Sequence, residues 1–273
     1  MNSNNKNITI LSVSYNSGEH LGRLFMNLLD KAVNKESLKF LVVDNTGGKD
    51  KKLYDYFNNE LDLEFYSNDC QSSQRSISHA SALDLGLKKS NTVYTLILDP
   101  DIHIFKYGWD QFCIDLIQSE EKVVIGAPYP FWKLGKVHDY PSVVFMFFQT
   151  QQVQNFNKSF APFPNLLNRV VNSILRKITR LGIIANKRRL DKSKTLRLIT
   201  TILENLFGIT SPDTGKKIID SFKEHNFKSI NFEAVYSRDL KKNIKVKLSH
   251  LAEEFELYLY NNKPFITHMY GSG

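Results

Sequence analysis

The first 130 residues of this chain alternate between short apolar runs and amphipathic stretches, and this alternation limits the possible folds more than any other feature. Two apolar runs, Ile8–Val13 and Leu38–Val43, have the length and composition of buried strands. Between them, apolar residues recur at helical spacing: Leu21, Leu24, Phe25, Leu28, Leu29 and Ala32. Because strands that alternate with helices pair in parallel through right-handed crossovers, the pattern predicts an α/β fold with a mostly parallel central sheet flanked by helices.

The alternation continues to about residue 130, and the rest of the chain is less regular. In the first half we expect helices near residues 53–57, 74–89 and 109–117, and strands near 63–66, 93–98 and 123–125. In the second half we expect helices near 166–181, 194–207 and 218–222, a strand at 143–148, and short strands near 230–232 and 244–248. No repeat or long linker is present, so we expect one domain over 1–273, with halves at 8–130 and 131–273.

The composition is that of a soluble globular protein, with 42% hydrophobic residues. The longest strongly apolar run, Val143–Phe148, is far shorter than the roughly 20 residues of a transmembrane helix. The first seven residues are polar, without the apolar core of a signal peptide. Cys70 and Cys113 have no metal-ligand spacing and form no disulfide framework, so we expect a cytoplasmic location.

Polar residues stand where several of the predicted strands end. Asp44 follows the second strand, Asp99-Pro100-Asp101 follows the strand near 93–98, and the turn Ser14–Gly18 follows the first strand. An Asp-x-Asp triplet alone means little, because 16 aspartates in 273 residues give about one by chance. Ligands of parallel α/β sheets, however, bind beyond the carboxyl ends of the strands. The shared position of these residues therefore predicts a ligand site at this edge.

Asp99 and Asp101 are suited to holding a divalent cation and, through it, a diphosphate. Carboxylate oxygens bind Mg²⁺ and Mn²⁺, and the cation neutralises charge that develops on a phosphate leaving group. We expect Asp101 to be the first ligand and Asp99 to reach the metal or a ribose. His268 or His103 could complete the shell, since His103 shares strand parity with both aspartates and imidazole suits Mn²⁺ better than Mg²⁺.

These residues also have ordinary structural interpretations. Asp99 and Asp101 could form a solvated turn at a strand end, and Asp44 could cap the turn that follows it. His268 could be an exposed residue near the end of the sequence, and His79 a surface residue of the helix near 74–89. The convergence at one sheet edge favours the metal interpretation for the two aspartates.

The positive charge of the chain is concentrated in one region. Ten basic residues and only one acidic residue, Asp191, lie between Asn165 and Arg197, so the net charge of this segment is +9. The net charge of the whole chain is +8, so the rest of the chain carries about −1. The predicted helices of the segment also carry an apolar stripe. The pattern fits an interfacial helix on anionic lipid, or a stripe that packs on the domain beneath solvated charges. Nucleic-acid binding is the weakest interpretation, and we do not expect it.

Three segments together resemble family 2 glycosyltransferases of the GT-A fold. Ile10–Ser17 is similar to their opening strand and turn, Val42–Thr46 to their second strand, and Leu96–Asp101 to their metal-binding Asp-x-Asp segment. Near the end of the sequence, Pro264–His268 followed by Gly271-Ser272 is similar to a segment that supplies a metal-binding histidine in many of these enzymes. One departure is Asp84, where many members have asparagine in the helix before Asp-x-Asp.

The resemblance implies roles for individual residues. Asp99, Asp101 and His268 would bind Mn²⁺ or Mg²⁺, and Asp213 would be the catalytic carboxylate, although it is also well placed as a helix N-cap. The nucleotide of the donor would be contacted by the following residues: Ser14, Tyr15, Asn16, Asp44, His79 and Asp99. Residues 8–130 would then form the nucleotide-sugar half, and 131–273 the acceptor half with its basic helical region at 165–207.

The resemblance also implies an activity. The chain would be a metal-dependent, inverting glycosyltransferase that moves a sugar from a nucleotide-diphosphate donor to a glycan or lipid-linked glycan acceptor. Such a reaction would belong to cell-surface polysaccharide biosynthesis, at the inner face of the cell membrane. One alternative is a catalytically inactive GT-A domain that binds a membrane or a partner. A sugar nucleotidyltransferase would instead need a Gly-rich loop with a basic residue after the first strand, which Ser14–Gly18 does not provide.

Overall fold

The computed structural model describes residues 6–56, 63–70, 72, 74–162, 166–182, 184–240 and 242–270 of the chain. Asn165, at the start of the basic region, and Gly271-Ser272 lie outside these ranges.

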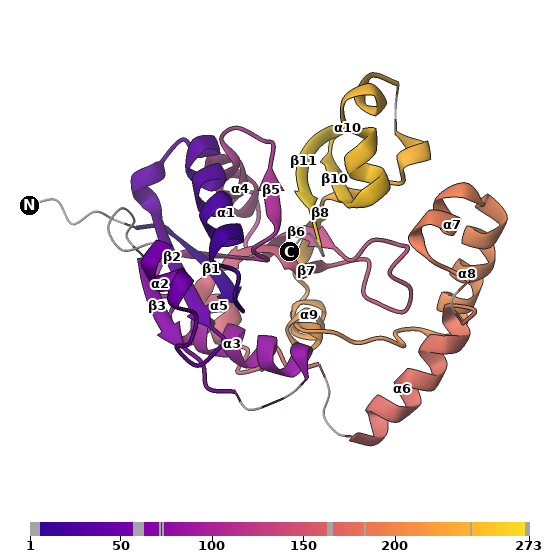
Figure 1. Cartoon of the computed structure of the whole chain (residues 1–273), viewed down its shortest axis with the longest axis horizontal. Coiled ribbons are helices and arrows are strands. Elements are labelled where there is room, and N and C mark those ends of the chain that lie inside the picture. Colours follow the sequence, from indigo (N-terminus) through magenta and orange to yellow (C-terminus); the bar gives the residue numbers. More distant parts are fainter. Residues whose placement is uncertain are drawn as a thin grey trace, which may run out of the picture.

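A seven-stranded sheet forms the centre of the protein, in the order β3-β2-β1-β4-β7-β6-β8 (Figure 1). The strands are β1 (Ile8–Ser14), β2 (Leu38–Asp44), β3 (Leu63–Ser67), β4 (Tyr94–Leu98), β6 (Val123–Pro128), β7 (Pro141–Gln149) and β8 (Lys228–Asn231). Strands β1 to β4 are mutually parallel, β7 runs antiparallel to both β4 and β6, and β8 is parallel to β6. The predicted α/β fold with a mainly parallel sheet is confirmed, and the run at 143–148 joins the sheet as expected.

Helices cover both faces of this sheet, which explains why its central strands, such as β1, are buried along their whole length. Helices α1 (Gly18–Lys31) and α4 (Trp109–Gln118) pack on one face, with Ile8 and Ile10 of β1. Helices α3 (Arg75–Lys89), α5 (Thr150–Gln154) and α9 (Lys216–Glu224) pack on the other, with Leu11 and Val13. Side chains alternate between the two faces of a strand, so each face of β1 needs apolar residues.

A second, antiparallel sheet has the order β5-β11-β10-β9. It contains β5 (Ile102–Ile104), β9 (Glu233–Ala234), β10 (Glu256–Tyr260) and β11 (Lys263–His268). Three aromatic rings connect the two sheets: Phe232 stacks on Phe265 with centroids 4.0 Å apart, and Phe145 of β7 lies 5.3 Å from Phe232. Because β11 pairs with β5, the end of the described chain lies next to the Asp-Pro-Asp turn.

The strand predicted at 244–248 is wrong, because these residues belong to helix α10 (Lys242–Glu254). The sequence alternates Ile244, Val246 and Leu248, which suggested a strand. Leu248 and Ala252 are four residues apart, however, and both pack against the apolar face of β10. Tertiary packing on one helical face therefore decides the conformation of this segment.

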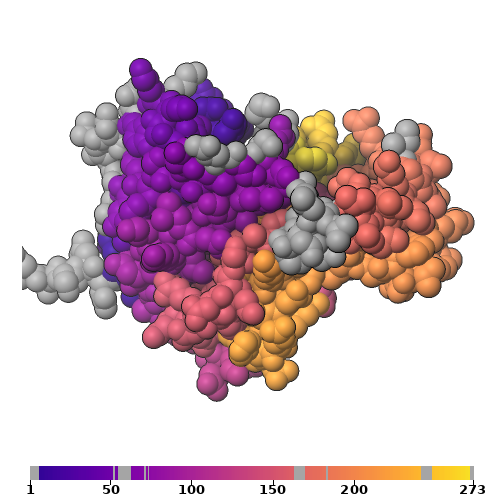
Figure 2. Space-filling model, turned by 90° about the horizontal axis from the view of Figure 1, so that it is seen from below, coloured from indigo at the N-terminus to yellow at the C-terminus, as the bar shows by residue number. Residues whose placement is uncertain are grey.

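The remaining elements lie at the periphery. They are α2 (Lys51–Tyr56), α6 (Leu166–Thr179), α7 (Lys187–Lys192), α8 (Lys194–Phe207) and two short 3-10 segments, Lys35–Ser37 and Ser237–Asp239. Helices α6, α7 and α8 lie together at one edge of the molecule, remote from α1 and α2 (Figure 1). In the space-filling view their salmon and orange atoms form a lobe on that side (Figure 2). Among the described residues, no helix has the length and apolar character to cross a membrane.

Candidate active site

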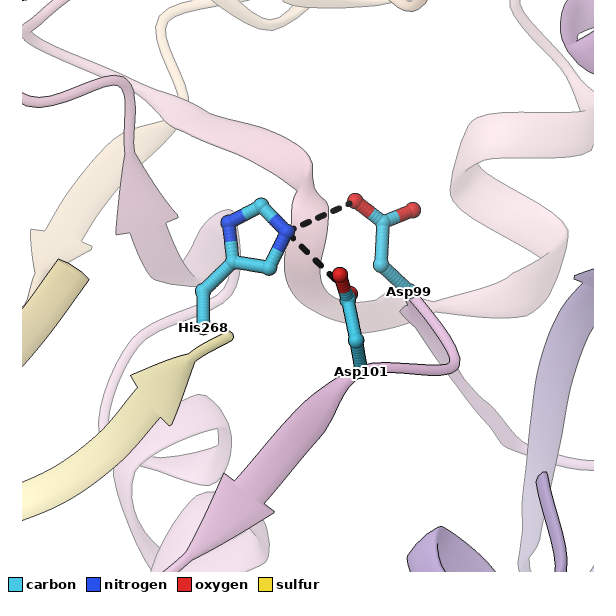
Figure 3. Close-up of side chains that lie close together, drawn as sticks. All are labelled: Asp99, Asp101 and His268. Atoms are coloured by element: carbon cyan, nitrogen blue, oxygen red, sulfur yellow. Dashed lines mark ion pairs between the residues drawn. The ribbon is translucent and has the colours of Figure 1, made fainter. Parts of the chain in front are cut away.

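Asp99, Asp101 and His268 converge at the carboxyl edge of the central sheet. Asp99 follows β4, Asp101 precedes β5, and His268 ends β11. The His268 Nε2 atom lies 3.2 Å from Asp101 Oδ1 and 3.6 Å from Asp99 Oδ2 (Figure 3). One ligand atom from each residue lies within 4.8 Å of the other two. Residues 167 positions apart in sequence therefore form a single cluster.

Backbone pairing holds this cluster in place. In the register of β5 and β11, His268 stands opposite Ile102, and the Met269 N–H donates to the Asp101 carbonyl at 2.9 Å. Asp99 is tied to the sheet by its own N–H, which donates to the Val144 carbonyl at 3.2 Å. Proline has no N–H and cannot donate to a sheet. Pro100 lies in the turn between β4 and β5, where no such hydrogen bond is needed.

His103, the other histidine considered for the metal shell, does not join this cluster. It lies on β5 between the buried Ile102 and Ile104 and packs edge-on against Phe105, with centroids 5.0 Å apart. Among the described residues, the one group of histidine, cysteine and acidic side chains suited to a metal contains His268 instead.

A buried carboxylate is hydrogen-bonded to the ring nitrogen of His268 that faces away from the two aspartates. Glu256 is completely buried, and its Oε2 is hydrogen-bonded to His268 Nδ1 at 2.9 Å. The Lys133 ammonium lies 2.7 Å from Glu256 Oε1, and the Tyr258 hydroxyl donates to Oε2 at 3.3 Å. Fixing Nδ1 in this way directs Nε2 toward the two aspartates, as outer-shell carboxylates do for metal-binding histidines.

The charges of the cluster fit a divalent cation. Burial alone would lower the pKa of His268, but its hydrogen bonds to Asp101 and Glu256 outweigh burial and raise that pKa to about 9. Burial raises the pKa of Asp99, and the charge of Asp101 adds to the effect. A proton on His268 thus stabilises two nearby carboxylates. A cation held by two carboxylate oxygens and one imidazole nitrogen would do the same more strongly, and this ligand set suits Mn²⁺.

His79 of α3 lies at the rim of this cluster. Its Nε2 is 4.0 Å from Asp99 Oδ1, and both side chains are partly exposed. The structure therefore brings His79 near Asp99, whereas the helix-surface interpretation is favoured from the sequence. Its contact with a nucleotide stays a prediction.

Three more of the residues expected near a nucleotide lie at the end of β1 and in the turn that follows it. Ser14 is buried, donates to Asp50 Oδ2 at 3.3 Å and accepts from the Ser17 N–H at 3.3 Å. Asn16 has a φ of 55°, in the left-handed region that asparagine tolerates. Tyr15 is 69% exposed, so it contributes little to packing. Ser14 therefore holds the turn, while Tyr15 is accessible to a ligand.

Asp44 is engaged by its own turn. It is completely buried; Oδ1 accepts from the N–H and hydroxyl of Thr46 at 2.9 and 2.7 Å, and Oδ2 accepts from the Gly48 N–H at 3.0 Å and the Tyr54 hydroxyl at 3.2 Å. These four bonds match the capping interpretation. The expected contact with a nucleotide base stays a prediction.

Asp213 lies next to two groups from the loop that follows β6. Its Oδ2 accepts from the Tyr129 hydroxyl at 3.1 Å and pairs with the Lys136 ammonium. The N-cap of α9 is Gly215, so Asp213 is not that cap. Burial opposes ionisation of Asp213, but Lys136 outweighs burial and lowers its pKa below the ordinary value. Asp213 is therefore ionised at neutral pH.

A cavity of about 510 Å³ adjoins Asp213. Its walls come from the start of α3, from α6 and from the loop before α9, and most side chains there are polar. They include Gln74, Ser76, Lys136, Ser173, Arg176 and Asp213. Hydroxyl, amide and cationic groups of this kind can bind the hydroxyls and anionic groups of a carbohydrate ligand.

Sequence reasoning missed Tyr129, Lys133, Lys136 and Glu256. The first three follow β6, which runs parallel to β4, so they lie at the same sheet edge as Asp99. The strand-end argument used for Asp44 and Asp99 would have found them. Glu256 had no such signal, because its role depends on the pairing of β10 with β11.

No family model and no curated protein match this sequence. Among solved structures, TarS of S. aureus in complex with UDP-GlcNAc is 16% identical over 56% of this chain, with a TM-score of 0.43. The mannosyltransferase PcManGT from Pyrobaculum calidifontis in complex with GDP-Man and Mn²⁺ is 9% identical over 80% of this chain and 74% of its own, with a TM-score of 0.48. The chain spans about half the length of the TarS structure, 48%.

The sheet order of this chain and the position of its Asp-Pro-Asp turn agree with the GT-A fold that the family resemblance implies. A mostly parallel sheet is flanked by helices, and the turn after β4 leads into a smaller sheet that supplies His268.

Proposed function

We propose that this protein is a metal-dependent glycosyltransferase. It transfers a sugar from a nucleotide-diphosphate donor to a hydroxyl of a glycan or lipid-linked glycan acceptor. The observation that carries the proposal is the convergence of Asp99, Asp101 and His268 at the carboxyl edge of the sheet. The polar cavity beside Asp213 offers room for the acceptor at the same end of the molecule.

Asp99, Asp101 and His268 would hold Mn²⁺ or Mg²⁺. When bound, the cation would neutralise the negative charge that develops on the leaving diphosphate. Glu256 keeps the Nε2 atom of His268 directed at the two aspartates. The nucleotide would lie over the carboxyl ends of β1 and β2, where Ser14, Tyr15, Asn16, Asp44 and His79 could contact it.

Asp213 is proposed as the general base. Its ionised carboxylate would take the proton of the acceptor hydroxyl as that oxygen bonds to the anomeric carbon. The bond from this carbon to the diphosphate oxygen breaks at the same time, and its electron pair leaves with the diphosphate. Such a direct displacement inverts the configuration of the sugar. Lys136 keeps Asp213 ionised and so ready to accept a proton.

Calorimetric titration tests this proposal. We expect UDP, GDP or dTDP to bind in the presence of Mn²⁺ and to lose affinity when EDTA is added. Asp101→Asn should abolish the Mn²⁺-dependent part, whereas the exposed Asp30→Asn should bind as wild type does. Unchanged Mn²⁺-dependent binding by Asp101→Asn would contradict the proposed site. Normal binding without turnover on any donor and acceptor would favour the alternative of an inactive GT-A domain that serves as a binding module.

A further inference from the structure

Helices α6 and α8 expose their apolar faces. On α6, Val170, Val171, Ile174 and Ile178 are between 44% and 60% exposed; on α8, Leu198, Ile199, Ile202 and Leu206 are between 42% and 72% exposed. Each set recurs at three- and four-residue spacing and so forms one stripe along its helix. An amphipathic helix of a globular domain normally turns this stripe toward the core. For these exposed residues, the interpretation that the stripe packs on the domain is wrong.

Polar contacts hold the two helices in this orientation. Thr179 of α6 and Thr200 of α8 are buried. Glu204 lies on the inward side of α8, and its Oε1 is 3.1 Å from Nε2 of His138, in the loop after β6. Arg197 of the same helix pairs with Asp191 and Asp239. The polar side of α8 is thus engaged by the rest of the protein, and α6 turns Thr179 inward, where its hydroxyl lies 3.3 Å from that of Thr210, so both apolar stripes are outward.

Exposed cations lie on α6 and α8 and on α7, which stands between them in sequence. Lys177, Arg188, Arg189, Lys192 and Lys194 are all exposed. Within the described ranges, none of the five takes part in an ion pair with a carboxylate. Segment 165–197 carries +9, so a second copy of the chain would meet the same positive charge across this face. Apolar residues flanked by unpaired cations complement a surface that is anionic outside and apolar beneath, as a membrane of acidic phospholipids is.

We propose that α6 and α8 dock the protein on an anionic lipid surface. The apolar stripes enter the boundary between headgroups and acyl chains, and the lysines and arginines contact lipid phosphates. This inference does not depend on the proposed transferase activity, because it rests on the exposure and charge of the two helices.

The docking surface adjoins the cavity beside Asp213. Asn172, Ser173 and Arg176 lie on the side of α6 opposite the centre of its apolar stripe, and together with Val170, at the edge of that stripe, they line the cavity. A docked α6 thus lies between the lipid surface and the cavity. If the proposed function holds, an acceptor anchored in the same membrane would be presented close to Asp213.

Vesicle co-sedimentation of the full chain tests the inference. We expect binding to vesicles of phosphatidylglycerol and phosphatidylcholine at low salt, much weaker binding to phosphatidylcholine alone, and a decrease as salt screens the charges. Replacing both stripes at their centres, with Ile174→Gln and Ile202→Gln, should weaken partition about tenfold or more, because two isoleucines no longer leave water. Lys177→Gln with Lys194→Gln should weaken only the anionic component.

Met26→Gln with Lys35→Gln is the matched control, since both residues are exposed on the remote N-terminal half. It should bind vesicles as wild type does. Equal recovery of wild type with and without anionic vesicles would overturn the inference, and so would equal partition of wild type and the double isoleucine variant. Concentration-dependent dimerisation that the isoleucine variant abolishes would assign the face to a second copy instead. Binding to an acidic protein, without vesicle binding, would also overturn it.

Discussion

Glu256→Gln is the substitution that best tests how the metal cluster is built. Glu256 contacts neither aspartate, yet it holds His268 Nδ1 at 2.9 Å and is completely buried. Glutamine keeps the size of the side chain but removes its charge. Loss of an outer-shell partner typically weakens metal affinity 10- to 100-fold, or about 1.4–2.8 kcal/mol. We therefore expect the Mn²⁺ dissociation constant to rise by that factor.

Free Mn²⁺ is measured directly by electron paramagnetic resonance during titration of the protein. The melting temperature of each variant shows that the fold persists, and Lys133 can turn to water because its side chain is 25% exposed. Glu254→Gln is the control, since Glu254 is exposed and only two residues away. A Mn²⁺ affinity of Glu256→Gln within about twofold of wild type would refute the role of Glu256 in orienting His268.

Three further changes test other parts of the structure. Asp213→Asn should reduce turnover about 10²–10⁴-fold while donor affinity changes little, and retained turnover would exclude Asp213 as the base. Phe265→Ala should lower the free energy of unfolding in urea by about 3–5 kcal/mol, because the ring joins the two sheets; a loss below about 1 kcal/mol would contradict this packing role. Burial lowers the pKa of His138, but Glu204 outweighs burial and raises it. Stability from this pair is present at acidic pH and lost as pH rises through the raised pKa, so the destabilisation by His138→Asn should shrink with increasing pH; a pH-independent difference would contradict it.

Residues at strand ends could be predicted from sequence, because the rule that places them is local. Once the alternation of strands and helices is recognised, Asp44 and Asp99 must lie at the same edge of a parallel sheet. His268 needed the family resemblance, since no local rule pairs β11 with β5. Glu256 could not be predicted from the sequence, because its contact with His268 arises from the pairing of β10 with β11 in the second sheet.

The outward orientation of α6 and α8 could not be predicted either. Periodicity shows that a helix has an apolar stripe, but it does not show which side faces the protein. On α8 the polar partners of Glu204 and Arg197 decide, and those partners come from other parts of the chain. The mistaken strand at 244–248 has a related cause, because Leu248 fits either period until the packing of Ala252 is known.

Anomalous scattering from crystals soaked with Mn²⁺ and a nucleoside diphosphate tests the central claim most directly. The account predicts one strong manganese peak bounded by Asp99, Asp101 and His268, with the diphosphate in contact with the ion. A manganese peak elsewhere, or a nucleoside diphosphate bound away from these three residues, would contradict it.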